Sequence, residues 1–157
     1  MISVDDALLD RLSDAARTTP RLRKNHNLHP SDESRCHRLL NAIEPGSYIR
    51  PHRHLDPEKD ESFILLRGQL GVIEFDDTGQ ITSTALLCST GTCQVATIPH
   101  GIYHTAVSLM SGTIFFEAKA GPYRPLESPE KALWAPDEHD SNANEYLQRL
   151  CAAFDSP

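Results

Sequence analysis

Apolar residues recur with the period of an α-helix near both ends of the chain. Over residues 4–17 they fall near one face, and Ser3 stands before them as the expected N-cap. Residues 141–154 show the same pattern, with Ser141 as the expected N-cap. The pattern therefore predicts a short helix at the N-terminal end and another at the C-terminal end.

From about residue 36 to residue 119 the pattern changes to that of β-strands. Short runs rich in Ile, Val, Thr and Phe alternate with turn residues such as Pro45-Gly46 and Ser111-Gly112. About eight antiparallel strands of this kind predict a mainly β jelly-roll barrel or sandwich. The runs cover residues 38–44, 48–51, 62–67, 70–76, 80–87, 94–98, 103–109 and 113–119.

Residues 21–38 are the basic part of the chain and leave two interpretations open. They are either a solvated loop or a segment that presents Arg23, Lys24 and Asn25 to an anionic ligand. His29 is likewise left between an exposed loop and the lining of a pocket. These four residues are our candidates for substrate binding.

Residues 120–140 are predicted to form an ordered extended loop. Four prolines in this stretch preclude a long helix. Tyr123 and Trp134 are expected to anchor the loop against the barrel.

Composition narrows the class of protein. The 157 residues carry a net charge of −7, so the chain lacks the basic footprint of a nucleic-acid binder. Apolar runs are far shorter than a membrane span, and the N-terminus has no basic and apolar leader, so we expect a cytoplasmic protein. Four scattered cysteines without a Cys-x-x-Cys pair indicate reduced thiols.

Histidines provide the candidate chemistry. His52 and His54 are two residues apart, and on a strand their side chains point to the same face. Two convergent imidazoles are half of a transition-metal site. Glu61 follows at the start of the next predicted strand, and His104 lies where a returning strand could complete the site. His100 is interpreted as a turn residue.

Two further histidines, His37 and His139, have no partners in sequence. Both are expected at the surface.

The spacing of the candidate ligands resembles the two motifs of the cupin superfamily. The first, G-x5-H-x-H-x3/4-E-x6-G, is matched from Gly46 to Gly68, with six residues between His54 and Glu61. The second, G-x5-P-x-G-x2-H-x3-N, is matched at its centre by residues 99–104. The resemblance covers most of the predicted strands.

This resemblance implies a single-domain cupin, a double-stranded β-helix, over residues 36–119. Residues 1–35 and 120–157 would pack on this barrel. The resemblance also implies one divalent metal, and Fe, Mn, Ni, Zn, Co and Cu all accept nitrogen and oxygen ligands of this kind. The implied ligands are His52, His54, Glu61 and His104.

The six-residue spacing leaves two carboxylates to weigh. Glu58 has the family's usual spacing from His54, whereas Glu61 has the usual spacing to Gly68. We favour Glu61 because it adjoins an apolar strand whose register fixes the direction of its side chain. Glu58 lies among charged residues typical of an exposed turn.

Three stretches of sequence narrow the resemblance to a subfamily of the cupins. They are the H-R-H-L-D-P insertion and the flanking R-L-R-K-N-H-N-L-H and A-G-P-Y-R-P-L segments. Together they look like the WbuC-type cupin-fold metalloproteins, small bacterial proteins often associated with O-antigen gene clusters. The cupin resemblance further implies a homodimer.

Three functional hypotheses follow. The first is a metal-dependent enzyme, an isomerase, epimerase or oxygenase, acting on a small sugar-like or anionic metabolite of surface-polysaccharide synthesis. The second is a non-catalytic metal-dependent module that binds or senses a small molecule. The third is a barrel whose site is only structural. Neither nucleic acid nor a membrane is an expected partner.

Overall fold

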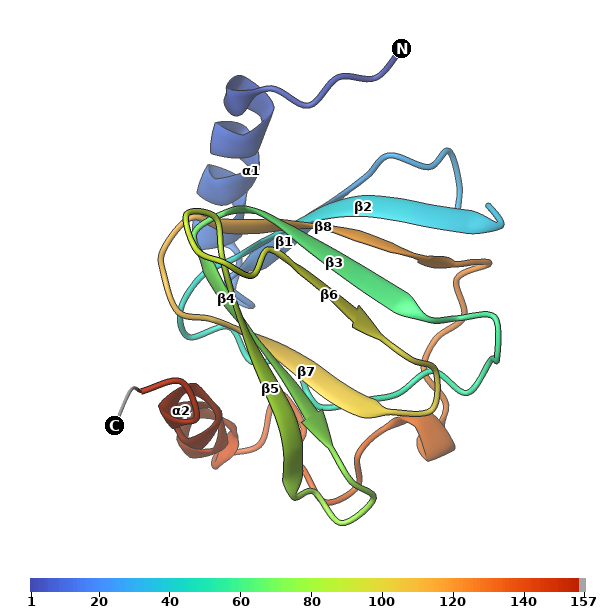
Figure 1. Cartoon of the computed structure of the whole chain (residues 1–157), viewed down its shortest axis with the longest axis vertical. Coiled ribbons are helices and arrows are strands. Elements are labelled where there is room, and N and C mark those ends of the chain that lie inside the picture. Colours follow the sequence, from blue (N-terminus) through green and yellow to red (C-terminus); the bar gives the residue numbers. More distant parts are fainter. Residues whose placement is uncertain (156–157) are drawn as a thin grey trace.

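The computed structural model describes residues 1–155, which form two antiparallel sheets that face one another (Figure 1). The five-stranded sheet has the order β1-β2-β8-β3-β6, and the three-stranded sheet has the order β5-β4-β7. The predicted mainly β jelly roll with a short helix near each end is confirmed. Its elements are α1 (Asp6–Thr18), β1 (Arg23–Asn27), β2 (Cys36–Ile43), β3 (Glu61–Arg67), β4 (Gln69–Phe75), β5 (Ile81–Cys88), β6 (Val95–Ile98), β7 (Tyr103–Ser108), β8 (Thr113–Ala120) and α2 (Ala143–Ala152).

Three apolar layers hold these elements together. The central layer lies between the sheets and includes Phe63, Leu70 and Phe115. Helix α1 covers the outer face of the five-stranded sheet with Leu9, Leu12 and other apolar residues of its buried stripe. Helix α2 and the segment before it cover the outer face of the three-stranded sheet. The interior between the sheets is therefore sealed on both broad sides.

The two predicted helix caps are wrong by one or two residues. Helix α1 begins after Asp5, whose carboxylate accepts a hydrogen bond from the Leu8 amide at 2.9 Å, so Ser3 is not the N-cap. Helix α2 begins after Asn142 rather than Ser141. In helix α1 the carboxylate of Asp5 reaches the third amide of the helix, that of Leu8, because Asp5 lies closer than Ser3 to the apolar stripe.

The strand prediction fails in two places. Residues 48–51 are not a strand. The Pro51 carbonyl instead accepts a hydrogen bond from the Ala132 amide at 3.1 Å, and the guanidinium of Arg50 donates to the Ala132 carbonyl, so this stretch is held by the segment before α2. Conversely, β1 lies in the basic segment, whose sequence favours a loop or a ligand-presenting stretch. It pairs with β2 from Arg23 opposite Ile43 to Asn27 opposite Leu39. As an edge strand it is polar, so its hydrophobic pattern gave no signal.

Gly68 makes the tight connection between β3 and β4. Its φ is +79°, and a Cβ atom there would lie 2.4 Å from Oγ1 of Thr113. Both the backbone angle and the close approach favour glycine at this position. The connection places β3 in one sheet and β4 in the other.

The proline-rich segment is an ordered connection with one short 3-10 helix at Ser128–Glu130. Trp134 packs against the rings of Phe75 and Tyr103, as expected of an anchor. Tyr123 is 53% exposed, so its expected role as an anchor is wrong.

Within the described residues, no helix combines the length and the apolar character needed to cross a membrane. Cys36, Cys88, Cys93 and Cys151 are free thiols.

Candidate metal centre

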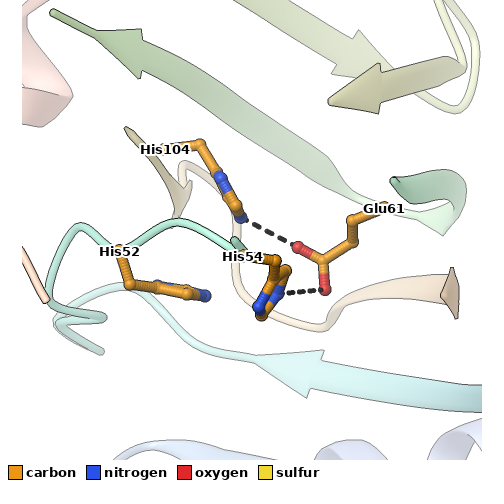
Figure 2. A group of neighbouring side chains, drawn as sticks. All are labelled: His52, His54, Glu61 and His104. Carbon is orange, nitrogen blue, oxygen red and sulfur yellow. Dashed lines mark hydrogen bonds and ion pairs between the residues drawn. The ribbon is translucent and has the colours of Figure 1, made fainter. Parts of the chain in front are cut away.

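Four side chains converge between the two sheets near one end of the barrel (Figure 2). His52 and His54 come from the connection between β2 and β3, Glu61 opens β3, and His104 lies on β7. One potential ligand atom from each residue lies within 4.8 Å of all the others. His54, Glu61 and His104 are each more than nine-tenths buried. The structure thus brings together all four residues that the resemblance implied as ligands.

Backbone hydrogen bonds hold the histidine segment against the three-stranded sheet. The amide of His52 donates to the His104 carbonyl at 3.0 Å, and the amide of His104 donates back at 2.8 Å. The amide of Gly101 donates to the His54 carbonyl at 2.7 Å. The pair of hydrogen bonds between His52 and His104 is an isolated β-bridge just after the predicted strand of residues 48–51. Together with the bond from Gly101 it keeps the side chains of His52 and His54 directed at the cluster.

The outer ring nitrogens fix the orientation of two imidazoles. Nδ1 of His52 lies 3.1 Å from the Arg50 carbonyl, and Nδ1 of His104 lies 2.9 Å from the Ile102 carbonyl. A carbonyl only accepts, so each Nδ1 carries the proton and donates it. Nε2 of each ring is then the atom that faces the cluster and can act as a ligand.

The distances inside the cluster fit a metal. Nε2 of His104 lies 2.9 Å from one oxygen of Glu61. Nε2 of His54 stands 3.7 Å from the other oxygen, too far for a hydrogen bond, and this buried atom has no hydrogen-bond partner among residues 1–155. Metal–ligand bonds of ~2.1 Å place adjacent octahedral ligands ~3 Å apart and opposite ligands ~4.2 Å apart. The two measured separations lie within this range, and the 4.8 Å limit on the whole set is only slightly wider, so small side-chain movements would let the four atoms share one ion.

The charge states of these groups differ. Burial and the neighbouring His104 lower the pKa of His52 to about 3, so its imidazole is neutral at physiological pH. Burial also opposes ionisation of Glu61, but Lys119 and His104 hold the pKa of this carboxyl well below its usual range. Burial would lower the pKa of His104, yet its hydrogen bond and charge interaction with Glu61 raise it. The cluster therefore holds a carboxylate, a neutral imidazole and an imidazole that tends to keep its proton.

Sequence reasoning missed three polar residues beside the cluster. Lys119 on β8 donates to Glu61 at 2.6 Å and to Glu117 at 2.7 Å. Glu117 also accepts from the side-chain amide of Asn41 on β2 at 2.6 Å. A signal was present, because Glu117 and Lys119 follow Phe115 at steps of two and so share its inward face.

Burial and the nearby charge of Glu61 raise the pKa of Glu117 to about 7, against the effect of Lys119. Burial opposes the charge on Lys119, but the two carboxylates outweigh it and raise the pKa of the ammonium. The protonation of Glu117 therefore depends on the charges of Glu61 and Lys119, and the charge of Lys119 depends on both carboxylates.

A cavity of about 1130 Å³ connects the cluster to the surface. The four predicted substrate residues, Arg23, Lys24, Asn25 and His29, all lie along its wall. Arg23 is already paired with Glu138 and donates to the Tyr48 carbonyl. Lys24 and Asn25 are exposed, whereas His29 is 6% exposed. The structure therefore places these residues at the cavity but not next to the four-residue cluster.

The remaining histidines and the alternative carboxylate have clear positions. His37 is 5% exposed and stacks on His29 at 4.0 Å between ring centroids, so its expected surface position is wrong. It is inward because β2 places it opposite Lys119. His100, in a turn, and His139 are exposed as predicted. Glu58 is exposed and lies outside the cluster.

Comparison with known proteins places the chain among cupin folds. Residues 4–87 match the family described as "Domain of unknown function (DUF6016)". No curated protein matches the chain in sequence.

Three solved structures share the architecture. KdgF from a Halomonas species has a TM-score of 0.52 at 16% identity, with 68% of this chain and 85% of that chain covered. The protein TT1209 from Thermus thermophilus has a TM-score of 0.52 at 24% identity, with 76% and 97% covered. A cupin superfamily protein, DSY2733, from Desulfitobacterium hafniense has a TM-score of 0.51 at 14% identity, with 69% and 86% covered. At these identities the likeness shows the fold, and the jelly roll described above is that of a cupin.

Proposed function

The chain belongs to the family described as "Domain of unknown function (DUF6016)", and from this family and the cupin fold we propose that it is a metal-dependent protein for a small ligand. One divalent transition metal is held by Nε2 of His52, Nε2 of His54, Nε2 of His104 and a carboxylate oxygen of Glu61. The preferred function is an enzyme that acts on a small anionic or sugar-like metabolite.

The observation that carries the proposal is a buried donor set in which one ring nitrogen, Nε2 of His54, has no hydrogen-bond partner among the described residues. Three imidazoles and a carboxylate converge in a buried position, and Nε2 of His54 has no hydrogen-bond partner within the described chain. Burying a polar atom without a partner costs free energy, which a bound cation at this point would recover. Mixed nitrogen and oxygen ligation suits several first-row transition metals.

When bound, such a metal polarises a ligand carbonyl or hydroxyl oxygen, or lowers the pKa of a coordinated water. The residues around it supply orientation. The carbonyls of Arg50 and Ile102 hold two imidazole rings in the ligating tautomer. Phe63 and Phe115 form an apolar part of the cavity wall and exclude water from the interior.

The nature of the ligand is inferred from the cavity. Its volume of about 1130 Å³ lies slightly above the ~300–1,000 Å³ usual for small-molecule sites, so it has room for a small metabolite. Lys24 lines its wall and is exposed, which favours an anionic ligand. The resemblance to WbuC-type proteins supports a link to surface-polysaccharide (O-antigen) synthesis as the finer part of this proposal.

The cupin resemblance supports two further parts of the proposal, a homodimer and a barrel of residues 36–119 on which residues 1–35 and 120–157 pack. A cytoplasmic location is proposed from the sequence of the N-terminus, which has no basic and apolar leader.

A second candidate function is a non-catalytic module that binds or senses a small molecule in a metal-dependent way. It is favoured by the ion pairs of Glu61, which bonds to both Lys119 and His104 in the described structure. These protein partners would satisfy Glu61 whenever the ion leaves, as reversible binding requires.

The test begins with protein purified without chelator and analysed for bound metal. His54→Ala removes the unpartnered ligand, and we expect its metal affinity to fall by more than the roughly 10–100-fold typical of losing an outer-shell partner. His100→Ala is the matched control, because His100 is an exposed turn residue paired with Asp60. Equal metal affinity for the wild type and His54→Ala would refute the proposed site.

Metal-loaded protein is then screened for turnover and for oxygen uptake with sugar acids and nucleotide sugars. Turnover that is lost in EDTA and in His54→Ala supports the enzyme. A ligand-dependent rise in melting temperature, lost in EDTA and not accompanied by turnover, supports the binding or sensing module instead.

A further inference from the structure

Lys119 is a cation in direct contact with one of the candidate metal ligands. Strand β8 pairs with β3 so that Lys119 is directly opposite Glu61. Its ammonium contacts Glu61 at 2.6 Å and Glu117 at 2.7 Å. Its side chain is 20% exposed, and it lines the same cavity as the cluster. A lysine is therefore held inside the barrel by two carboxylates.

Stability alone does not account for a buried lysine at this position. A buried ion pair is often neutral or unfavourable compared with apolar residues of similar volume. Apolar side chains occupy inward positions further along the same strands, Phe63 one step from Glu61 on β3 and Phe115 two steps from Lys119 on β8. The interior thus gives up apolar packing to keep a cation that reaches the cavity.

A bound metal would change the partners of this cation. With Glu117 ionised, the two carboxylates and the ammonium together carry one negative charge. A divalent ion on the cluster turns this into one positive charge, which favours a singly charged anion in the cavity. The metal also draws on the oxygens of Glu61, so Lys119 shares that carboxylate and has a donor available to another acceptor. An ammonium offers three N–H donors, and two carboxylates do not exhaust them.

We propose that Lys119 recognises the carboxylate of the ligand next to the metal, and that Glu117 and Asn41 position the ammonium for this contact. The inference rests on the proposed metal site and assigns the ligand class as a small hydroxy-carboxylate. Metal and anion then bind cooperatively, because the ion on the cluster changes the net charge beside Lys119 from negative to positive. Asn41 contributes by donating to Glu117 at 2.6 Å, which fixes the carboxylate that holds Lys119 from behind.

The experiment uses Mn(II)-loaded full-length protein, with glycolate as the probe anion and ethylene glycol as its uncharged counterpart. Calorimetric titration measures the affinity for each. We expect Lys119→Met to weaken glycolate binding by about tenfold or more, the value of one charge-assisted hydrogen bond. Ethylene glycol binding should change less than twofold, and Mn(II) affinity should be kept or increased because a like charge has been removed.

The matched control is Lys131→Met, which removes an exposed lysine from the same cavity wall. It should leave glycolate affinity within about twofold. Because Lys119→Met leaves two buried carboxylates without their cation, the double variant E117Q/K119M removes the pair together and carries the same expectation. Equal loss in Lys131→Met would overturn the specific role of Lys119.

The outcomes separate the two proposals. Failure of wild-type protein to bind Mn(II) or another divalent metal would refute the metal site and this inference with it. Metal binding with equal glycolate affinity in the wild type, in Lys119→Met and in the double variant would overturn the role of Lys119 alone. Glycolate binding of the same strength with and without metal would overturn the proposed cooperativity.

Discussion

The interior of the barrel has two halves that are built from the same strands and differ in what they bury. On β3 the inward positions pass from Glu61 to Phe63 and Leu65, and on β8 they pass from Lys119 to Phe115. Successive inward positions are only two residues apart, so the change from charged to apolar occurs within one or two steps. One face of a strand can therefore serve both a site and a core.

The two halves contribute to the molecule in opposite ways. Fully burying a large apolar side chain stabilises a fold by about 1.5–3 kcal/mol. Burying a charge costs several kcal/mol unless partners compensate for it. The apolar half, with Leu70 and Phe63, therefore stabilises the sheets, whereas the paired charges of Glu61 and Lys119 in the other half are expected to add little net stability.

The largest expected effect lies in the apolar half. Leu70→Ala should lower the free energy of unfolding by about 2–5 kcal/mol, because Leu70 is fully buried between the sheets. Chemical denaturation measures the change. Metal affinity of the folded variant should stay within about twofold of wild type, and a large loss would show that the two halves are not separable.

Leu133→Ala serves as the control for that measurement. Leu133 is 76% exposed, so its truncation should change the free energy of unfolding by less than about 0.5 kcal/mol.

The next effect is confined to the polar half. Glu61→Gln keeps the shape of the side chain but removes the anionic ligand, and metal affinity should fall at least about tenfold, or 1.4 kcal/mol. Glu58→Gln, at the exposed carboxylate that sequence spacing left as an alternative, should leave it unchanged. Competition with a coloured chelator measures both. The reverse order of effects would assign the ligand to Glu58.

The smallest effect is the dependence of metal uptake on pH. Glu61 raises the pKa of His104 in the metal-free protein, so a metal must displace the proton that this imidazole holds. Below that pKa the affinity should fall by up to about tenfold per pH unit, whereas His52, with a pKa of about 3, adds nothing at neutral pH. Calorimetry at pH 6, 7 and 8 in two buffers of different protonation enthalpy counts the released proton.

The stability of the protein without metal should depend on pH in the opposite direction to metal affinity. A histidine whose pKa is raised on folding contributes stability at low pH, and this contribution is lost as the pH rises through the folded value. Metal affinity that is the same at pH 6 and pH 8 would contradict the proposed proton on His104.

Local patterns in the sequence predicted much of the fold. Short apolar runs separated by turn residues indicated seven of the strands, and the amphipathic period indicated both helices. β1 was not predicted, because this edge strand, from Arg23 to Asn27, buries little apolar surface and so leaves no hydrophobic pattern in the sequence. His37 was misplaced because a polar residue that is buried by tertiary contacts has the same local sequence signal as an exposed one.

The candidate ligands were accessible to sequence reasoning because His52 and His54 are close in the chain and the spacing to Glu61 and Gly68 follows a motif. The residues that surround Glu61 could not be predicted from the sequence. Lys119 is 58 residues from Glu61 in sequence, and their contact depends on which strands are neighbours and in what register.

The amino-acid sequence by itself determined the alternation that makes these strands and supplied the histidines and carboxylate at metal-binding spacings. Only the tertiary structure decided that β8 lies between β2 and β3, and so that Lys119, Glu117 and Asn41 meet beside Glu61. The physical reason is that side-chain direction along a strand is a local property with a period of two, whereas strand order and register result from burial summed over the whole barrel.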